Sequence, residues 1–463
     1  MNRKKAILLL EEYYDDGFFF KDLSRRIAFQ TESQNPDKVS NLYEYLSREI
    51  TPSLNEIGFD CKIYENPDSK FKGPFLVGNR HEGNNLPTVL VYGHGDVVRG
   101  EDNNWRKGLN PWKVVKEGDR LYGRGTADNK GQHTINFAAI KYILKARKYK
   151  LGYNIKILIE TGEENGSPGL REFCKQNKEI LKANVLIASD GPRLKKERPT
   201  IFMGSRGVFN FTMKVNLRRG AFHSGNWGGL LSNPGIILAH AISSLISSSG
   251  EIKVAGLKPE KIPKSIKNVI NKINIIQNSD GPIIDHSWGE KGLSLEEKLF
   301  AWNTLEVLSF KTGNPENPMH AIPPEAVANC HIRYVVPSDP KKFLKIIRKH
   351  LDQEGFEIVK IEATRGLMSA TRLDPEHPWV RWTIKSLKKT SGVEVDVLPN
   401  LGGTLPNDAF SEILNLPTIW IPHSYPSCSQ HAPNEHILES ITKSALKIMG
   451  GIFWDLGEPG VPK

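Results

Sequence analysis

Cysteine is scarce in this chain. Among 463 residues there are only four, and no two are spaced as Cys-x-x-Cys; they are Cys61, Cys174, Cys330 and Cys428. Small disulfide-rich domains use many more cysteines, and thiolate zinc sites need closely spaced pairs. The sequence therefore excludes a disulfide framework and a closed, cysteine-ligated zinc site.

The N-terminus has no long apolar run. Its first such run, residues 6–10, is followed at once by Glu11 and Glu12. A secretory signal and a membrane span both need a longer run. We therefore expect a cytoplasmic protein without a membrane partner. A length of 463 residues with 38% hydrophobic content is enough for two domains of about 100 to 200 residues each.

Fingerprints of three common enzyme classes are absent. The chain has neither a Walker motif nor a Gly-x-Gly-x-x-Gly dinucleotide motif, which excludes the usual phosphate-binding loops. The nucleophile elbow Gly-x-Ser-x-Gly is missing too, since Gly204-Ser205-Arg206-Gly207 has the wrong spacing. A serine hydrolase of that type is therefore excluded.

Positive charge exceeds negative charge, giving a formal net charge of +11. The densest basic stretches, residues 195–198, 258–272 and 341–349, are interrupted by acidic or apolar residues, as is typical of solvated helix faces. No basic stripe interleaved with aromatics accompanies them, so we expect no nucleic-acid partner. The charge can still draw anionic substrates toward a cleft.

Acids and histidines gather in five short motifs. In chain order these are Gly93-His94-Gly95-Asp96, Gly125-Thr126-Ala127-Asp128, Glu163-Glu164, Ser189-Asp190 and Gln430-His431-Ala432-Pro433-Asn434-Glu435. Each motif alone is typical of a turn or a solvated pair. An open metal site, however, takes neutral imidazole and carboxylate ligands, and two histidines with three carboxylates suffice for two divalent ions. The joint order of the motifs therefore favours a two-metal hydrolase.

Short apolar runs precede these motifs. Residues 88–92 lead into His94, residues 155–159 into the Glu pair, residues 185–187 into Asp190, and residues 418–421 run toward His431. Such runs are typical of buried parallel strands, whose carboxyl ends bind ligands. Two metals at that edge can share a bridging carboxylate, polarise a carbonyl and supply hydroxide near neutral pH. We expect Asp128 to be the bridge.

The ordered motifs resemble those of the dinuclear zinc peptidase and deacylase family, and the resemblance spans nearly the whole chain. This family includes acetylornithine deacetylase, succinyl-diaminopimelate desuccinylase, glutamate carboxypeptidase and carnosinase-like dipeptidases. The resemblance implies that His94 and Asp190 bind one metal. It likewise implies that Glu164 and His431 bind the other, with Asp128 shared between them.

The resemblance also implies roles for two acids that are not ligands. Glu163 would be the general acid/base, since adjacent glutamates leaving a strand can point differently, one at a metal and one at its water. Asp96 would orient His94, because a ligating imidazole usually donates its other nitrogen to a carboxylate and Asp96 lies two residues away.

We expect an α/β protein with a mostly parallel central sheet flanked by helices and an inserted ferredoxin-like lid and dimerisation domain. The expected bounds are 1–206 for the first part of the catalytic domain, 207–368 for the lid and 369–463 for the second part, with an insertion at about 251–301. Residues 209–217 alternate apolar and polar side chains, which predicts a strand with one wet face.

The rest of the lid completes a β-α-β-β-α-β order. We expect a helix over 232–248, strands over 304–310 and 326–336, a helix capped at Ser338 with Pro340, and a strand over 356–362; a helix over 379–390 follows in the catalytic domain.

Lid residues and one glycine turn are candidates for substrate binding. The resemblance implies that His223 reaches a substrate oxyanion, often across a dimer, whereas taken alone it is typical of a loop histidine bonded to backbone. Arg333 suits bidentate capture of a carboxylate, or could partner a surface acid. The resemblance also places Gly402 and Gly403 along the pocket. The residues that follow, 405–408, depart from the common family sequence, which leaves the role of Asp408 open.

These residues predict a metal-dependent hydrolase that cleaves an amide bond beside a free carboxylate in a small peptide, most simply a dipeptidase or carboxypeptidase-type exopeptidase. The alternative is an N-acyl amino acid deacylase. Both enzyme classes use the same metal chemistry, so only the residues of the substrate pocket distinguish them. An inactive metal-binding protein is a third class, disfavoured by the presence of Glu163. We expect two divalent ions per subunit, zinc first with manganese or cobalt as substitutes, and a homodimer formed through the lid.

Overall fold

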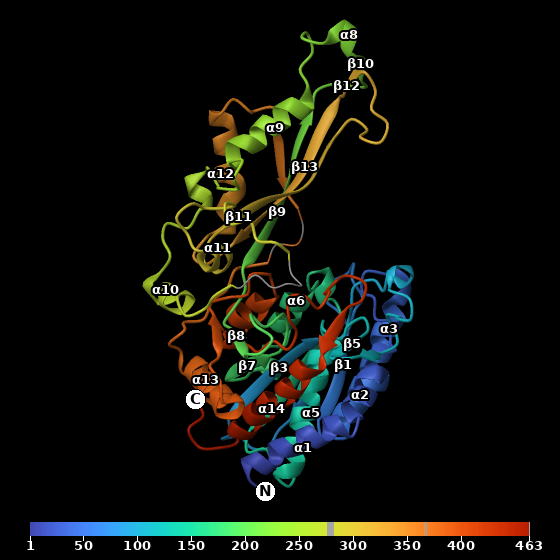
Figure 1. The fold of residues 1–463 in the computed structure, drawn as a ribbon, viewed down its shortest axis with the longest axis vertical. Helices are drawn as coiled ribbons and strands as arrows, with labels where there is room; N and C mark the ends of the chain where they lie inside the picture. Colours follow the sequence, from blue (N-terminus) through green and yellow to red (C-terminus); the bar gives the residue numbers. More distant parts are fainter. Residues whose placement is uncertain (276–281, 365, 367, 463) are drawn as a thin grey trace.

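An eight-stranded sheet forms the centre of the lower body of the molecule (Figure 1). The computed structural model describes residues 1–275, 282–364, 366 and 368–462. The strands, in spatial order, are β1 (Asp60–Tyr64), β2 (Phe75–Arg80), β6 (Asn154–Glu160), β3 (Thr88–His94), β7 (Val185–Ala188), β16 (Thr418–Trp420), β8 (Thr200–Phe202) and β15 (Asp396–Leu398). Strands β6, β3, β7 and β16 pair in parallel, while β1 and β2 form an antiparallel edge. The predicted mostly parallel central sheet is confirmed.

Both faces of this sheet are covered. On β3, Val89 and Val91 pack in one hydrophobic cluster, whereas Leu90 and Tyr92 pack in another. The first cluster includes residues of α1 (Arg3–Asp15), α2 (Phe18–Ile27), α5 (Lys130–Ala146), α13 (Pro378–Ser391) and α14 (Glu439–Asp455). The second includes residues of α6 (Leu170–Gln176) and α7 (Lys178–Leu181). Burial on both faces explains why these strands are apolar without alternation.

A small second sheet joins two distant motifs. Its order is β17 (His436–Leu438), β5 (Arg120–Tyr122) and β4 (Val115–Glu117). Because β17 follows the His431 motif and β5 precedes the Asp128 motif, their pairing brings both motifs to one place. The remaining short helical segments of the lower body are η1 (Pro36–Lys38), α3 (Val39–Glu44), η2 (Tyr45–Ile50), α4 (Thr51–Asn55), η3 (Asp102–Asn104), η4 (Glu163–Asn165) and η6 (Ala409–Ile413).

The upper part contains a four-stranded antiparallel sheet, called here the lid sheet. Its order is β11 (Thr304–Thr312), β13 (Glu325–Tyr334), β9 (Gly207–Asn216) and β14 (Lys360–Ala363). Helices α9 (Pro234–Leu245) and α12 (Pro340–Gln353) bury residues in one cluster with Phe211 and Val215 of β9. The order β9-α9-β11-β13-α12-β14 confirms the predicted β-α-β-β-α-β unit.

Two details of the lid differ from the predictions. Asp339, not Ser338, caps α12, because the Asp339 side chain accepts a hydrogen bond from the Lys341 amide at 3.1 Å. The last lid strand begins at Lys360 rather than residue 356. The Val359 amide donates to the Phe356 carbonyl at 3.0 Å, so a turn occupies the residues expected to be extended.

The far end of the lid carries a small projection that the sequence did not predict, called here the extension. It consists of β10 (Phe222–His223), α8 (Ser224–Trp227) and β12 (Ala321–Ile322), with β10 and β12 paired. The extension lies at the end of the molecule opposite both termini (Figure 1). It is not a regular part of the ferredoxin-like unit, since each of its strands has only two residues.

The insertion at about 251–301 packs against the lower body. Its described elements are η5 (Ala255–Leu257), α10 (Lys264–Ile270) and α11 (Leu295–Phe300). Ile266 and Phe300 belong to the same hydrophobic cluster as Trp420 of the central sheet. Residues 276–281 of this insertion lie outside the described residues. Within the described part of the chain, every helix is too short or too polar to traverse a bilayer.

Candidate metal centre

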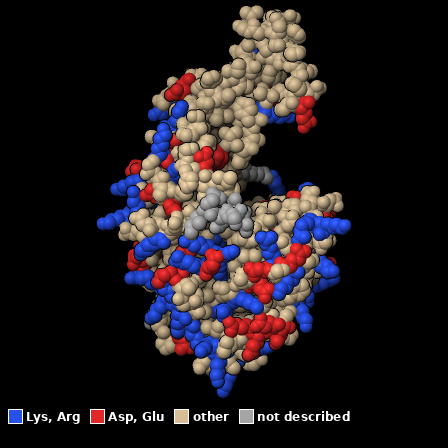
Figure 2. All heavy atoms as spheres, in the orientation of Figure 1, with Lys and Arg blue, Asp and Glu red and all other residues tan. Residues whose placement is uncertain are grey.

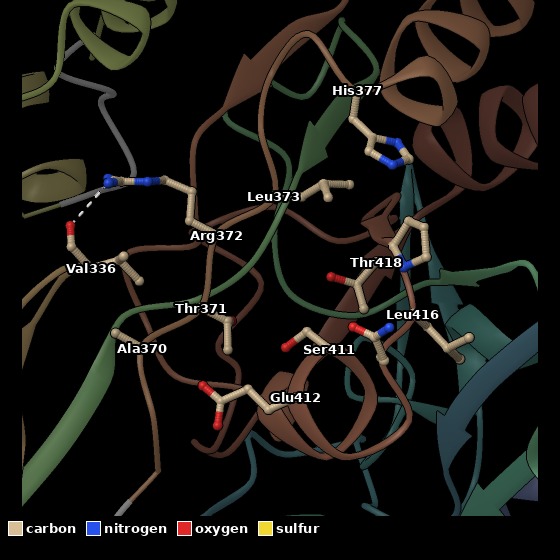
Figure 3. A pocket seen from close by; sticks show the side chains of 12 residues that line it. Val336, Ala370, Thr371, Arg372, Leu373, His377, Ser411, Glu412, Leu416 and Thr418 are labelled. Carbon is tan, nitrogen blue, oxygen red and sulfur yellow. Dashed lines mark hydrogen bonds between the residues drawn. The ribbon is translucent and has the colours of Figure 1, made fainter. Parts of the chain in front are cut away.

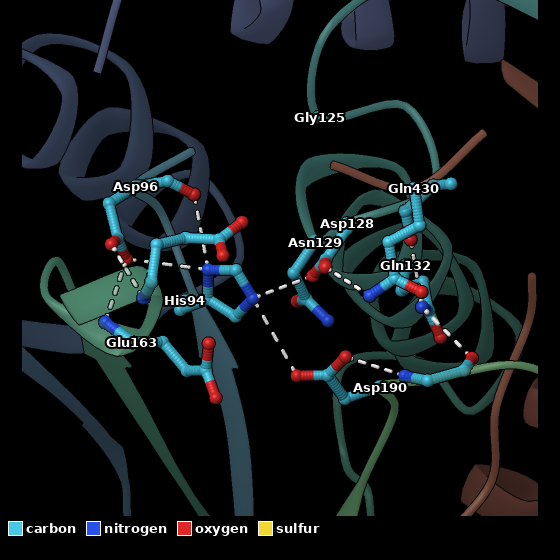
Figure 4. A network of polar contacts seen from close by, with 12 residues as sticks. His94, Asp96, Gly125, Asp128, Asn129, Gln132, Glu163, Asp190 and Gln430 are labelled. Atoms are coloured by element: carbon cyan, nitrogen blue, oxygen red, sulfur yellow. Dashed lines mark hydrogen bonds and ion pairs between the residues drawn. The ribbon is translucent and has the colours of Figure 1, made fainter. Parts of the chain in front are cut away.

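His94 ends β3 and is fully buried. Its Nδ1 atom lies 3.1 Å from the Asp96 carbonyl oxygen and 3.3 Å from Asp96 Oδ1. The Asp96 carboxylate also accepts hydrogen bonds from the amides of Glu163 and Glu164, at 3.2 and 3.1 Å. Asp96 thus connects the imidazole at the end of β3 to the glutamate pair that follows β6. The other imidazole nitrogen, His94 Nε2, faces Asp128 and Asp190 (Figure 4).

Asp128 lies between the two histidines. Its Oδ1 is 2.9 Å from His94 Nε2, and its Oδ2 is 3.0 Å from His431 Nε2. Gln430 also donates a hydrogen bond from its side-chain amide to Oδ2 (Figure 4). One carboxylate therefore faces two imidazoles with different oxygens, which is the arrangement expected of a bridging ligand.

The structure brings all five predicted ligands together in two overlapping groups. One group is His94, Asp128 and Asp190, and the other is Asp128, Glu164 and His431. In each group one ligand atom per residue lies within 4.8 Å of the others. Asp190 Oδ2 is 3.6 Å from His94 Nε2, and Glu164 Oε2 is 3.0 Å from His431 Nε2.

The protein atoms alone leave this cluster unsatisfied. Glu164 Oε1 and Asp190 Oδ2 are buried and accept no hydrogen bond from the described residues. Burial, followed by the nearby Asp128 charge, raises the pKa of both Glu164 and Asp190 to about 7. Burial also opposes ionisation of Asp128, yet hydrogen bonds from His431 and His94 hold its pKa below the usual value. Imidazole and carboxylate donors with excess negative charge fit divalent cations.

Glu163 lines the cavity above these ligands. This cavity has a volume of about 740 Å³ and is bounded below by the acidic cluster and above by side chains of the lid sheet, including Asn210, His331 and Arg333. Burial, partly opposed by His94, raises the pKa of Glu163 well above its usual value. The predicted acid/base and four of the predicted ligands, Asp128, Glu164, Asp190 and His431, therefore line one cleft between the lower body and the lid.

Arg333 extends from β13 into the roof of the cavity. Its Nη1 atom donates a hydrogen bond to the Thr404 hydroxyl, beside Gly403, which also lines the cavity. Gly402 does not line it; its carbonyl accepts a 2.6 Å hydrogen bond from Arg206 Nε. Of the two predicted glycines, one contributes directly to the wall and the other holds the turn in place.

Comparison with known proteins agrees with this geometry. A sequence profile described as Peptidase family M20/M25/M40 matches residues 90–455, a stretch that contains every predicted metal ligand. The chain belongs to this peptidase family. The resemblance inferred from the motifs is confirmed, and so is the prediction of a metallopeptidase enzyme.

Several relatives of this M20 peptidase are dipeptidases. The chain is 26% identical over 483 residues to the Beta-Ala-His dipeptidase of Mus musculus, covering 95% of this chain and 93% of that one. It is 24% identical over 400 residues to the Cysteinylglycine-S-conjugate dipeptidase of Corynebacterium striatum, covering 84% of each.

Solved structures share the fold. An M20 family metallo-carboxypeptidase, Sso-CP2 from Sulfolobus solfataricus, matches with a TM-score of 0.80 at 25% identity, covering 95% of this chain and 99% of that one. The dipeptidase Dug1p of Saccharomyces cerevisiae matches with a TM-score of 0.81 at 21% identity, covering 99% of each chain. The predicted fold class is confirmed.

His223 does not reach the cavity of this M20 peptidase within one chain. It lies on the exposed extension, where its Nδ1 accepts a 3.1 Å hydrogen bond from the Gly225 amide. It is not among the residues that line the 740 Å³ cavity. A single subunit therefore brings together every predicted site residue except this histidine and Gly402.

Some features of the site were not predicted. Gln430 stands in a recognised motif but was given no role, and its contact with Asp128 depends on the loop conformation. His331 and Asn210 line the roof, and only the alternation of the lid strands hinted that they share a face with Arg333. Asp408, whose role was open, is buried and accepts two hydrogen bonds from Arg171, at 2.6 and 2.7 Å.

A second cavity lies away from the metal ligands. It has a volume of about 460 Å³ and is lined by Arg372, His377 and Glu412 among others (Figure 3). Arg372 donates a 2.9 Å hydrogen bond to the Val336 carbonyl at the end of the lid. None of the predicted site residues lines this second cavity.

Proposed function

We propose that this M20 peptidase is a dipeptidase-type exopeptidase that hydrolyses the amide bond beside a free carboxylate. One observation carries the proposal: a cluster of two histidines and three carboxylates, joined through Asp128, lies across a single cavity from the Arg333 guanidinium. A small peptide bound in this cleft would reach from the candidate metal ligands to Arg333. The dipeptidase relatives support the same substrate class.

We infer that the cluster holds two divalent ions per subunit, with zinc as the first candidate because imidazole and carboxylate ligands in an open site suit it. His94 and Asp190 would bind one ion, Glu164 and His431 the other, and Asp128 both. When bound, the ions supply Lewis acidity toward the scissile carbonyl and lower the pKa of the attacking water.

Glu163 is placed to move the proton. It lies on the cavity wall next to Glu164, and burial raises its pKa well above the usual value, as is common for a carboxyl group that acts in general acid/base catalysis. We propose that Glu163 takes a proton from the attacking water and delivers it to the leaving amine. Asp96 would keep His94 oriented through the 3.3 Å contact to Nδ1.

Arg333 would hold the carboxylate of the substrate. It is positioned by its hydrogen bond to Thr404, and a guanidinium offers several donors in a fixed plane. Burial lowers its pKa somewhat, but the group remains charged at neutral pH. The Gly403 backbone, beside Thr404 on the same wall, would let the substrate approach the chain closely.

We propose a homodimer in which His223 acts on the partner's substrate. His223 is remote from the cavity of its own subunit, and the extension around it exposes large apolar side chains: Phe222, Trp227, Leu230 and Met319. The face shown in Figure 2 carries few charged residues there. Exposed apolar area of this kind is typical of an interaction surface. The cytoplasmic location expected from the sequence stays a prediction.

A deacylase is the alternative that one observation favours. Among the described residues, the acids lining the cavity are Asp128, Glu163, Glu164 and Asp190, and all four have a role in metal or proton chemistry. No further carboxylate among the residues that the structure describes lines the cavity to meet a free α-amino group. A dipeptidase would therefore use one of these four, or a group from a second subunit, for that purpose.

A substrate panel tests the proposal. Unblocked dipeptides, the same dipeptides with an N-acetyl group, and N-acetyl and N-succinyl amino acids should be compared in Zn²⁺, Mn²⁺ and Co²⁺. Preference for unblocked dipeptides over their N-acetyl forms is expected. Preference for the N-acyl amino acids would establish the deacylase instead, and no hydrolysis of any member would remove the amidohydrolase proposal.

A further inference from the structure

Glu435 is a buried carboxylate that the proposed reaction does not use. It is 1% exposed and accepts four hydrogen bonds, each from the segment that ends in the bridging aspartate. Oε1 accepts from the amides of Ala127 and Asp128, at 2.9 and 3.0 Å. Oε2 accepts from the Gly125 amide and from Arg124 Nη1, both at 3.0 Å. One side chain thus accepts hydrogen bonds from three amides of one loop and from one nitrogen of a buried guanidinium.

These contacts tie together two segments that are 307 residues apart in the chain. Glu435 is in the same motif as His431, the ligand, and Gln430, which donates to the Asp128 carboxylate. The Glu435 carbonyl accepts from the Gly123 amide as well, at 3.0 Å. The 430–435 segment therefore holds Asp128 at two points. Glu435 accepts from the Asp128 backbone amide, and Gln430 donates to the Asp128 carboxylate.

The backbone of this segment needs such support. His431 and Asn434 have φ angles of 60° and 66°, in the left-handed region that non-glycine residues rarely adopt. Conformations of this kind persist when the surrounding contacts over-determine them. His431 is exposed, so packing of its side chain against neighbours does not fix its backbone conformation.

A carboxylate is required by the donors that surround it. All four groups directed at Glu435 are N–H donors, and Arg124 is itself 1% exposed and pairs with it. An amide in place of the carboxylate would direct its own N–H₂ group at some of these donors. Removing one partner of a buried hydrogen-bonded ion pair also leaves the other charge uncompensated.

We propose that Glu435 is a positioning residue that assembles the dinuclear site by locking the Asp128 loop to the segment carrying His431. Glu435 belongs to neither candidate ligand group; it would set the spacing between the Asp128 carboxylate and the His431 imidazole. This inference rests on the proposed two-metal function, because only then does the spacing have a chemical consequence.

The test measures metal affinity directly, by competition of the purified protein with a chromophoric chelator for Zn²⁺. Glu435→Gln should weaken the affinity for at least one of the two ions by about 10-fold to 100-fold, the range typical for groups that orient metal ligands. Added Zn²⁺ should restore much of kcat while leaving KM unchanged, which a general loss of folded protein would not produce.

A matched control comes from Asp455, which also accepts four hydrogen bonds, from two Arg3 nitrogens, Ser386 and Lys389. Asp455 lies on α14 and takes no part in the metal cluster. Asp455→Asn should lower Tm without changing Zn²⁺ affinity. If Glu435→Gln does not fold, Glu435→Asp, which keeps the charge but is too short to span the donors, is measured in the same assay and should also bind Zn²⁺ more weakly.

The outcomes separate the two proposals. A folded Glu435 variant that binds both ions with wild-type affinity overturns the positioning role, even if its Tm falls as that of Asp455→Asn does. If the wild-type protein itself binds fewer than two ions, the proposed function fails first. Weaker binding in the Glu435 variants but not in Asp455→Asn supports the inference.

Discussion

Two groups of buried acids in the lower body have different surroundings. At the edge where the parallel strands end, burial raises the pKa values of Glu164 and Asp190 to about 7, and oxygen atoms of both lack a hydrogen-bond partner among the described residues. Between α1 and α14, Asp455 accepts hydrogen bonds from Arg3 and Ser386. The first region leaves carboxylate oxygens without a partner among the described residues, whereas the Asp455 carboxylate is paired within the protein.

This difference separates function from stability. Buried carboxylates without a protein cation are costly to keep ionised, so a chain that keeps several of them together does so for a ligand. A carboxylate that is paired with arginine contributes to folding instead. Changes at the strand-end cluster should therefore alter activity far more than stability, and changes at Asp455 should do the reverse.

Removal of divalent ions should have the largest effect. We expect two ions per subunit in fully active protein, and a chelator should reduce turnover to background because the cluster then cannot polarise a carbonyl or activate water. Elemental analysis alongside activity measurements checks this. Full activity with one ion or none would show that the acids at this edge are not a dinuclear site.

Loss of the proton-transfer group should come next. Glu163→Ala should lower kcat by about 100-fold to 10,000-fold while both ions stay bound, because Glu163 belongs to neither ligand group. Glu164→Ala, its neighbour, should instead lose one ion. Near-normal turnover in Glu163→Ala would show that another group moves the proton.

The extension provides the next test. His223→Ala should lower kcat by about 100-fold to 1000-fold with little change in KM, if His223 stabilises charge that forms only in the transition state. Mixing His223→Ala with Glu163→Ala protein should restore part of the activity through hybrid dimers with one intact composite site. A verified mixed dimer without recovery would argue against action across subunits.

Arg333→Ala should mainly raise KM, because its partner carboxylate is present in the substrate from the start. A hydrogen bond to a charged group contributes about 1.5 to 3 kcal/mol, which corresponds to about 10-fold to 150-fold. The penalty should shrink for an amidated substrate. Arg372→Ala, in the other cavity (Figure 3), is the matched control and should leave KM unchanged. An equal penalty on the amidated substrate would remove Arg333 from the binding site.

The sequence predicted that the candidate ligands would lie close together, because several of them follow apolar runs; their assignment as ligands came from the family resemblance. Each apolar run, such as residues 88–92, predicts a buried strand, and parallel strands present their carboxyl ends at one edge. His94 and Asp190 follow neighbouring parallel strands and are brought together by this sheet, whereas Asp128 comes from the loop between β5 and α5. The same reasoning predicted the lid order, since alternation in residues 209–217 and the Pro340 helix start are local signals.

Contacts between distant segments could not be predicted in this way. The pairing of Asp408 with Arg171 and the four bonds to Glu435 depend on loops whose course no periodic pattern specifies. The extension is similar, because β10 and β12 have two residues each and lie about 100 positions apart. Ser338 was predicted to cap α12 in place of Asp339, because the side chains of both residues can accept a hydrogen bond from a helix amide.

The smallest effect should be on stability at the second acidic region. Partial burial opposes ionisation of Asp455, but hydrogen bonds from Arg3 and Ser386 hold its pKa below the usual value. A carboxyl group with a lowered folded-state pKa stabilises the fold at pH values above its unfolded pKa of about 4, and this contribution is lost as the pH falls through the folded-state pKa. Asp455→Asn should therefore destabilise the metal-loaded protein by about 1 to 2 kcal/mol at pH 7, allowing for solvent near Arg3. In urea unfolding, the gap to wild type should narrow below about pH 4. A gap that is constant with pH would mean that the lost contacts act through packing and not through the charge of Asp455.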